Sequence, residues 1–270
     1  MNQSISPGLP DYHTHHELCR HASGRTIDYA RAAAQAGIEE ICATDHCPTD
    51  VEFGKEHRMT LEQFDQYRDD VRHARDSVLD VTLLFGVEAD YYPGCEEFLK
   101  MFCDREEFDL VLGSIHFIDY WSNDPVRRGL SDAIDPDFVW REYYRMTGEL
   151  ADTGLYDILT HPDLPKRFGN RLNLGKVREY ALPALDRLAA AGMAIEINTS
   201  GMIHSIQQMY PGPEFLSWAA ERGIGLVFGS DAHTPDRVGD RFAEAKALAK
   251  DAGFKSARRY RKRTWTAYNL

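Results

Sequence analysis

Long apolar segments, an excess of positive charge and paired cysteines are all missing from this sequence of 270 residues. No apolar run approaches the roughly 18 residues that a membrane-spanning helix requires, so we expect no contact with a membrane. The formal net charge is -12. An acidic balance of this size argues against a broad surface for binding nucleic acid, so none is expected as a partner.

The five cysteines are an odd number and include no Cys-x-x-Cys pair. The first ten residues also lack the basic and then apolar pattern of a secretion signal. We therefore expect free thiols and a reducing, cytoplasmic setting. Linker-like and low-complexity segments are absent too, so residues 1–270 are expected to form a single domain.

Seven short apolar runs recur along the chain: Leu9–His15, Ile38–His46, Val81–Glu88, Asp109–His116, Tyr156–His161, Ala194–Asn198 and Gly225–His233. Each is rich in Val, Ile, Leu or Phe and is bounded by turn residues, which is typical of buried parallel strands. No glycine-rich phosphate loop follows any of them, which argues against nucleotide binding.

Amphipathic segments with helix signals separate these runs. Thr60–Gln63 forms a capping box, and Asp135 precedes a proline at a predicted first helical position. Glycines at 37, 192, 223 and 253 follow helical patterns as C-terminal caps. The alternation of strands and helices predicts an α/β fold, and at this length a closed TIM-like barrel is favoured over an open doubly wound sheet.

One basic cluster, Arg258–Arg263, stands out against the acidic remainder of the chain. We interpret it as the solvated face of a last helix rather than as a functional patch.

Residue types that bind metals end six of the seven runs. They are His13 and His15, Asp45 and His46, Glu88, His116, His161, and Asp231 with His233, while the remaining run ends on Asn198–Ser200. In an extended segment His13 and His15 share one face. Because the carboxyl ends of parallel barrel strands meet at one rim, these side chains are expected to converge on a metal site. His21, in the loop after the first run, is either a further ligand or an exposed loop residue.

So many ligands exceed the shell of one ion, which indicates two or three metals with the Glu88 carboxylate as the natural bridge. Closely spaced cations suit the hydrolysis of phosphate esters, because they clamp the phosphoryl oxygens and activate a shared water. A metal-bridging hydroxide would then attack phosphorus, and no serine or cysteine nucleophile would be required.

The motifs HTHHELCRHA, ATDHCP, GVEADYYPG, GSIHF, THPDL, INTSG and GSDAHTP resemble those of the polymerase and histidinol phosphatase (PHP) family. Within it, the segment Arg58–Leu61 resembles the monofunctional histidinol-phosphate phosphatases. The resemblance runs from about Asp11 to Gly239. It implies a distorted TIM-like (β/α)7 barrel with a trinuclear site holding zinc, manganese or iron.

The same resemblance implies how the ligands are shared between three divalent metal ions. His13, His15, Glu88 and Asp231 would hold the first ion; Glu88, His116 and His161 the second; His21, His46 and His233 the third. Glu88, Asp231 and His233 are the candidate catalytic residues.

The substrate side departs from the pattern of related phosphatases, which often carry a basic residue just after the NTSG-like segment. Here Gly201 is followed by Met202, Ile203 and His204. Candidate substrate-binding residues are Lys166, Arg167, Asn198, Ser200 and Arg58, with Arg20, His57 and His204 as further loop candidates. Arg or Lys is chemically apt for phosphate, although Lys166 and Arg167 are equally well explained as a solvated loop.

We therefore expect a phosphoric monoester hydrolase that converts L-histidinol phosphate to L-histidinol and phosphate, a step of histidine biosynthesis. One alternative is a phosphodiesterase or exonuclease that uses the same metal-dependent hydrolysis on nucleotides. The sequence shows no basic groove with aromatic residues of the kind that binds single-stranded nucleic acid. Another is a non-catalytic, metal-binding barrel module. The sequence leaves the native metal, the proton donor to the leaving group and the oligomeric state open.

Overall fold

The computed structural model describes residues 8–52, 54–118, 135–169 and 171–270. Its main sheet has six parallel strands in the order β1-β2-β3-β4-β5-β6. They are β1 (Glu40–Ala43), β2 (Thr82–Asp90), β3 (Leu110–Ser114), β4 (Ile158–Leu159), β5 (Ala194–Asn198) and β6 (Gly225–Gly229). Sequential order with every neighbour parallel is the arrangement of a curled α/β barrel sheet.

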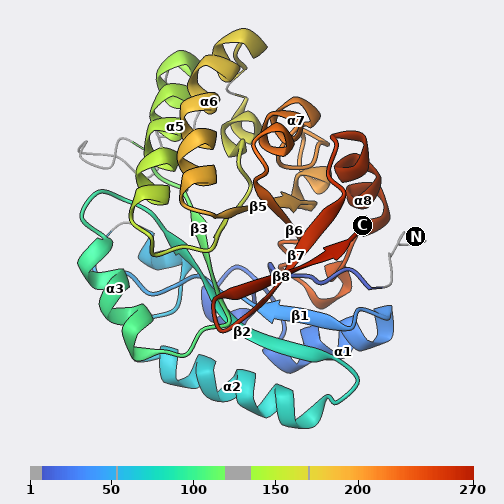
Figure 1. Cartoon of the computed structure of the whole chain (residues 1–270). Helices are drawn as coiled ribbons and strands as arrows, with labels where there is room; N and C mark the ends of the chain where they lie inside the picture. The colour runs from blue at the N-terminus through green and yellow to red at the C-terminus, as the bar shows by residue number, and fades with distance from the viewer. Residues whose placement is uncertain (1–7, 53, 119–134, 170) are drawn as a thin grey trace.

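Helices surround the strands on the outside (Figure 1). They are α1 (Thr26–Ala36), α2 (Phe64–Ser77), α3 (Glu96–Arg105), α5 (Pro136–Asp152), α6 (Leu174–Ala190), α7 (Pro213–Glu221) and α8 (Phe242–Asp251). Short 3-10 turns follow several strands: η1 (Glu17–Cys19), η2 (Lys55–His57), η3 (Leu164–Phe168), η4 (Ser200–Ile203) and η5 (Pro235–Arg237). No helix in the described ranges is both long and apolar enough to span a membrane.

The predicted helix signals are confirmed. The backbone amide of Thr60 donates to Gln63 Oε1 at 2.9 Å, and that of Gln63 donates to Thr60 Oγ1 at 3.3 Å. Asp135 caps α5 by accepting from the amide of Asp137. Gly37 ends α1 in the left-handed region at a φ of 72°, which glycine adopts without steric cost.

The first predicted strand, Leu9–His15, closes the sheet without forming a regular strand. Asp11 bridges Ile41 of β1, and Thr14 bridges Ala232 beyond β6. The amide of Tyr12 donates to Phe228 O at 3.0 Å, so the segment bonds to both edges of the sheet. The ladder is interrupted because the amide of His13 turns to the side chain of Asp11 at 3.3 Å. The barrel is therefore distorted, with six regular strands and one bridging segment.

A layer of apolar side chains fills the barrel interior. Its members come from the closing segment, from all six strands and from the C-terminal hairpin: Tyr12, Cys42, Leu84, Leu110, Leu112, Ile158, Ala194, Val227 and Tyr260. Along β2, Leu84, Gly86 and Glu88 alternate with outward residues and so share one face. The inward face of β2 therefore carries an apolar side chain, Leu84, toward the amino end of the strand and an ionisable one, Glu88, toward its carboxyl end.

The basic cluster lies in a β-hairpin, so the expectation of a solvated last helix is wrong. Strands β7 (Ser256–Arg261) and β8 (Thr264–Asn269) pair antiparallel. Their turn residues, Lys262 and Arg263, have φ values of 45° and 60°. A two-residue hairpin turn of this kind normally uses Asn or Gly, so the usual hairpin signal is missing from the sequence.

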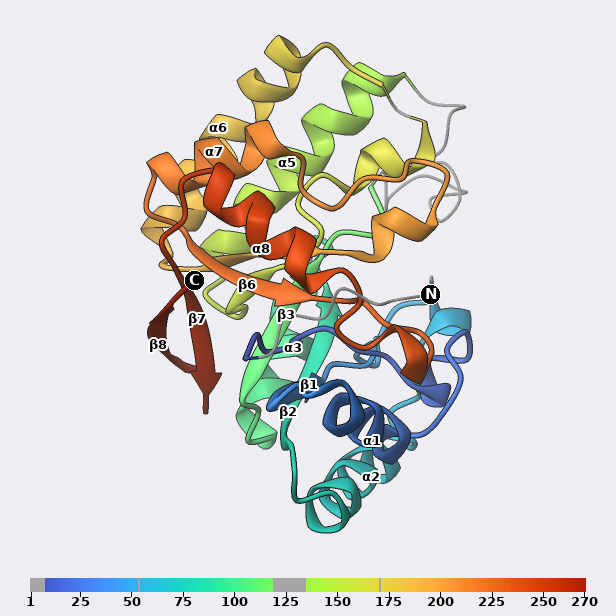
Figure 2. The same cartoon turned by 90° about the vertical axis from the view of Figure 1, so that its right-hand side faces the viewer.

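The hairpin covers the amino-terminal end of the barrel. In Figure 2 it lies on the left of the strands, and the arrowhead of β6 points away from it. Tyr260 is buried edge-on against Tyr12, with ring centroids 6.3 Å apart, and its amide donates to the Tyr12 hydroxyl. Arg261 and Arg263 pair with Glu40 and Asp157. The arginines therefore fasten the hairpin to the barrel.

We predict that Tyr260→Ala lowers the free energy of unfolding by about 3–5 kcal/mol, because it empties a fully enclosed aromatic position in the interior layer. Urea denaturation followed by circular dichroism measures the effect. The control is Thr266→Ala on the exposed face of the same hairpin, for which we expect a change within about 0.5 kcal/mol. Equal effects of the two substitutions would contradict a space-filling role for Tyr260.

Candidate metal centre

The nine candidate ligands converge at the carboxyl ends of the strands. His13 and His15 come from the closing segment, His21 from the turn after it, His46 from beyond β1 and Glu88 from β2; His116 follows β3, His161 follows β4, and Asp231 and His233 follow β6. Residues more than 200 positions apart in the chain thereby share one cluster, as the barrel geometry predicts.

Three groups of side chains each bring their ligand atoms within 4.8 Å of one another, and Glu88 belongs to two of them. In the first, His13 and His15 place their Nε2 atoms 3.0 Å apart. Glu88 lies 3.5 Å from both of these nitrogens, and Asp231 lies 3.2 Å from that of His15. These distances are short enough for one ion to contact all four side chains after small adjustments.

The second group joins Glu88 to His116 and His161, whose Nε2 atoms lie 3.7 Å and 3.1 Å from Glu88 Oε1. The third consists of His21, His46 and His233. The ring centroid of His21 lies 5.2 Å from that of His46 and 4.8 Å from that of His233. Apart from Asp231, these groups contain the residues of the three ligand sets that the resemblance implies; the assignment of the sets to three ions stays a prediction.

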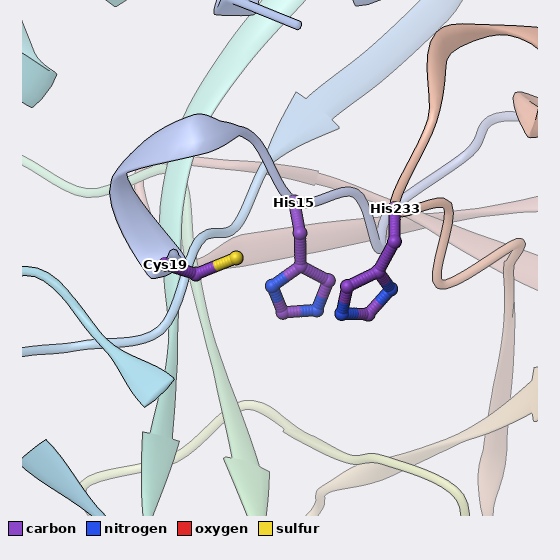
Figure 3. A group of neighbouring side chains, drawn as sticks. All are labelled: His15, Cys19 and His233. Carbon is purple, nitrogen blue, oxygen red and sulfur yellow. The ribbon is translucent and has the colours of Figure 1, made fainter. Parts of the chain in front are cut away.

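A further group, which the sequence did not suggest, contains Cys19 with His15 and His233. Figure 3 shows the thiol of Cys19 directed toward the ring of His15, with the ring of His233 beside it. The two imidazoles stack with centroids 4.3 Å apart. Cys19 is buried, so its thiol packs beneath the cluster.

Buried charge gives the cluster its electrostatic character. Although burial alone would raise the pKa of the Glu88 carboxyl, the imidazoles of His13, His46 and His116 lower it well below its usual range. Burial would likewise lower the pKa of His13, but carboxylates including Glu196 outweigh it and raise the pKa well above its usual value. Glu88 and His13, whose Oε1 and Nε2 atoms lie 3.5 Å apart, thus stabilise each other's charged forms inside the barrel.

The third group behaves differently. Burial lowers the pKa of His46 to about 3, and it lowers that of His233 to about 4, in each case assisted by the neighbouring His15. The pKa of His21 is lowered as well, again chiefly by burial. All three imidazoles are therefore neutral near pH 7, and neutral imidazole is the form that binds a metal.

Three carboxylates that were not proposed as ligands lie close to the Nδ1 atoms of ligand histidines. Glu196 lies 2.8 Å from His13 Nδ1. Asp45 lies 3.3 Å from His15 Nδ1, and Asp90 lies 2.5 Å from His116 Nδ1. A carboxylate behind a ligating histidine fixes its tautomer and ring orientation. For Asp45 and Asp90 the sequence carried a signal, because they lie within two residues of the predicted ligands His46 and Glu88. Glu196 lies in the middle of β5, in the run without predicted ligands, and had no such signal.

Backbone conformation marks the same region. His161 and Asp231 have φ values of 27° and 52°. Such values are uncommon outside glycine and asparagine, and they collect at functional sites. At Gly229, an added Cβ would lie 1.8 Å from Glu196 Oε1 and 2.6 Å from His13 Cβ. The absence of a side chain at position 229 therefore makes room for the Glu196 and His13 pair.

A cavity of about 680 Å³ opens above the cluster. One part of its wall carries the candidate ligands, and another is apolar, with Phe117, Leu164, Phe168 and Ile203. His57 and His204, the two loop histidines predicted to be near a substrate, both line it. A cavity with an apolar wall and a few convergent polar groups is suited to a small molecule.

The predicted substrate-binding residues take different positions. Arg167 and Ser200 line the cavity. Arg58 also reaches it but forms a buried ion pair with Asp90 and donates to Gly54 O at 2.9 Å. Lys166 is turned away from the cavity, with its ammonium 2.8 Å from Asp163 and 2.7 Å from Met209 O.

Of the remaining candidates, Asn198 and Ser200 bond to carboxylates of the site, and Arg20 does not. Asn198 Nδ2 donates to Glu196 at 3.0 Å and to Asp231 at 3.2 Å. Ser200 Oγ donates to Asp231 at 3.0 Å. Arg20 lies outside the cavity wall and donates to Lys55 O. Asn198 and Ser200 therefore position Asp231.

Comparison with known proteins places this geometry in context. The model of the PHP domain matches residues 11–200. A probable histidinol-phosphatase of Deinococcus radiodurans is 40% identical over 250 residues, covering 91% of this chain and 94% of that protein. A histidinol-phosphatase of Bacillus subtilis is 26% identical and covers 85% of this chain and 95% of its own length.

Among solved structures, the histidinol phosphate phosphatase of Lactococcus lactis, complexed with zinc, L-histidinol and phosphate, superposes with a TM-score of 0.79. It is 20% identical, and the match covers 97% of this chain and 100% of that one. At this identity the similarity establishes the fold, a distorted TIM-like barrel.

We predict that Glu196→Gln weakens metal binding about tenfold to a hundredfold, because the neutral amide no longer holds the charge and orientation of His13. Competition with a coloured chelator measures the affinity. The matched control is Glu179→Gln, which removes an exposed carboxylate on α6 and is expected to leave the affinity unchanged. If both variants bind metal as the wild type does, Glu196 has no orienting role.

Proposed function

The chain belongs to the PHP domain family, and from this premise we propose that it is a metal-dependent phosphomonoesterase that hydrolyses L-histidinol phosphate to L-histidinol and inorganic phosphate. The observation that carries the proposal is the sharing of Glu88 between two ligand groups at the floor of the cavity. The 40% identity to a probable histidinol-phosphatase supports the choice of substrate.

Three divalent ions would occupy the centre. His13, His15, Glu88 and Asp231 would hold one; Glu88, His116 and His161 would hold another; His21, His46 and His233 would hold the third. The donor set of imidazoles and carboxylates fits zinc, manganese or iron. Such ions supply Lewis acidity, which activates water and offsets the charge that develops on phosphoryl oxygens.

The residues of the chain then bind and orient the substrate. Arg167 meets the phosphoryl group, and the apolar wall with Phe117 and Phe168 receives the imidazole ring of histidinol. His13 and His15 lower the pKa of Asp231 well below its usual range, against the effect of burial, so the carboxylate stays ionised, which is the form that binds a metal ion. Asn198 and Ser200 keep it in place.

We further propose that the enzyme acts in the cytoplasm as a single domain. All five cysteines are free in the structure, which suits a reducing compartment. One large cluster of buried apolar residues extends from Leu9 to Ala257, which supports a common core. The partner is the small-molecule substrate.

We predict that Glu88→Gln and His116→Ala each abolish turnover without unfolding the protein. Glu88 is the carboxylate shared by two of the proposed ligand groups, and His116 belongs to one of them, so each substitution removes a proposed metal ligand. Phosphate release is the assay, and circular dichroism verifies the fold. Glu97→Gln, on the exposed face of α3, is the control and is expected to retain full activity. Robust turnover by either purified site variant would rule out the proposed mechanism.

We also predict a marked preference for histidinol phosphate over a generic phosphomonoester and a phosphodiester when phosphate release by the metal-loaded protein is compared. Complementarity of the cavity to the histidinol portion is the reason for this preference. A faster reaction with the diester would instead indicate a phosphodiesterase, and no turnover with any metal would indicate a binding module.

A further inference from the structure

Positive charge reaches the cavity from more than one loop. Of the lysines and arginines in the described ranges, those that line the cavity are Arg58, Arg167 and Arg237. Arg58 is committed to the buried carboxylate of Asp90. Arg167 on η3 stays open to an anionic ligand, and so does Arg237 on η5, which pairs with Asp240 but keeps 24% of its side chain exposed, against 4% for Arg58.

Arg237 is held in a fixed position. Its Nη2 lies 2.6 Å from Asp240 Oδ2, and Asp240 is only 7% exposed. The turn is closed on both sides of the arginine, since the amide of Arg237 donates to Thr234 O and the amide of Asp240 donates to Arg237 O. A guanidinium restrained in this way loses little conformational entropy when it binds an anion.

His204 ties the two arginines to one region of the cavity. Arg167, His204 and Arg237 all line the one cavity, and the charges of the two arginines add to the effect of burial in lowering the pKa of His204. The carboxylate of Asp231 acts on His204 in the opposite sense. Asp231 of the candidate metal centre lines the same cavity as the two arginines.

The loop after β5 brings no cation to this region, because Met202 and Ile203 follow Gly201 there. Ile203 nevertheless lines the cavity and is 58% exposed. A phosphate monoester carries close to two negative charges near pH 7, and planar guanidinium groups match its oxygens in pairs.

We propose that Arg237 is a phosphate-binding residue, which together with Arg167 contacts the terminal oxygens of the substrate phosphoryl group. The proposal deepens the proposed function and rests on it for the identity of the substrate as a phosphomonoester. Asp240 is the positioning residue that aims the guanidinium. Arg237 thereby supplies, from the loop after β6, the positive charge that the loop after β5 lacks.

The test uses inorganic phosphate as the probe and the metal-loaded protein as it is purified. We expect Arg237→Gln to weaken phosphate binding, measured by calorimetry, about tenfold to a hundredfold through loss of a charged hydrogen bond. Arg237→Lys keeps the charge but not the paired geometry, and should recover part of the affinity. In turnover assays the Gln substitution is expected to raise KM for any phosphomonoester that the wild type accepts.

Arg241→Gln is the matched control. Arg241 also pairs with a carboxylate three residues later, Glu244, but it does not line the cavity. Its loss should leave phosphate binding unchanged. Metal content, measured by elemental analysis, should stay the same in all variants, which separates a direct contact from an effect transmitted through His233.

A second experiment moves the positive charge from the loop after β6 to the loop after β5. In the Arg237→Gln background, Ile203→Arg adds a guanidinium to the same cavity from the loop after β5, and we expect it to restore part of the phosphate affinity. Unchanged phosphate affinity in Arg237→Gln, or weaker affinity accompanied by loss of metal, would overturn the proposal. A wild-type protein that binds phosphate but does not hydrolyse histidinol phosphate would contradict the proposed function. The comparison of phosphate affinity between wild type and Arg237→Gln would still decide whether Arg237 binds phosphate.

Discussion

The carboxylate of Glu88 is the group on which the arrangement of the site depends. It is 1% exposed and lies within 3.7 Å of imidazole nitrogens from His13, His15, His46, His116 and His161. A buried charge of this kind is tolerated only when opposite charges or metal ions surround it. Because its histidine neighbours come from four different segments of the barrel, the fold must hold all of these segments in register around one side chain.

The two ends of the barrel differ in the side chains that point inward. At the carboxyl ends of the strands, inward positions carry ionisable groups that need partners and ions. At the amino ends, the same inward face is apolar and is covered by Tyr260 of the hairpin. The arginines of the hairpin reach Glu40 and Asp157 at its edge. The charged site therefore lies above a layer of buried apolar side chains.

Much of the fold and of the candidate site could be predicted from the sequence because both depend on short-range patterns. Strand runs ending in ligand types gave the positions of His46, Glu88 and His116, and helix caps such as Asp135 marked the helices. The hairpin could not be predicted, since Lys262 and Arg263 adopt positive φ through contacts with the distant Asp109 and Asp157. The orientation of Lys166, bonded to Met209 O, also depends on a contact between distant segments.

The hydrogen bonds behind the imidazoles have a consequence for which metal the protein contains. His13, His15 and His116 direct Nδ1 to carboxylates, while His21 and His233 direct Nδ1 to the carbonyls of Cys19 and Asp231. Each of these rings therefore presents Nε2 before any ion arrives. Rings oriented by the protein itself offer the same imidazole and carboxylate donors to zinc, manganese or iron, so the orientation of the rings does not by itself select one of these metals.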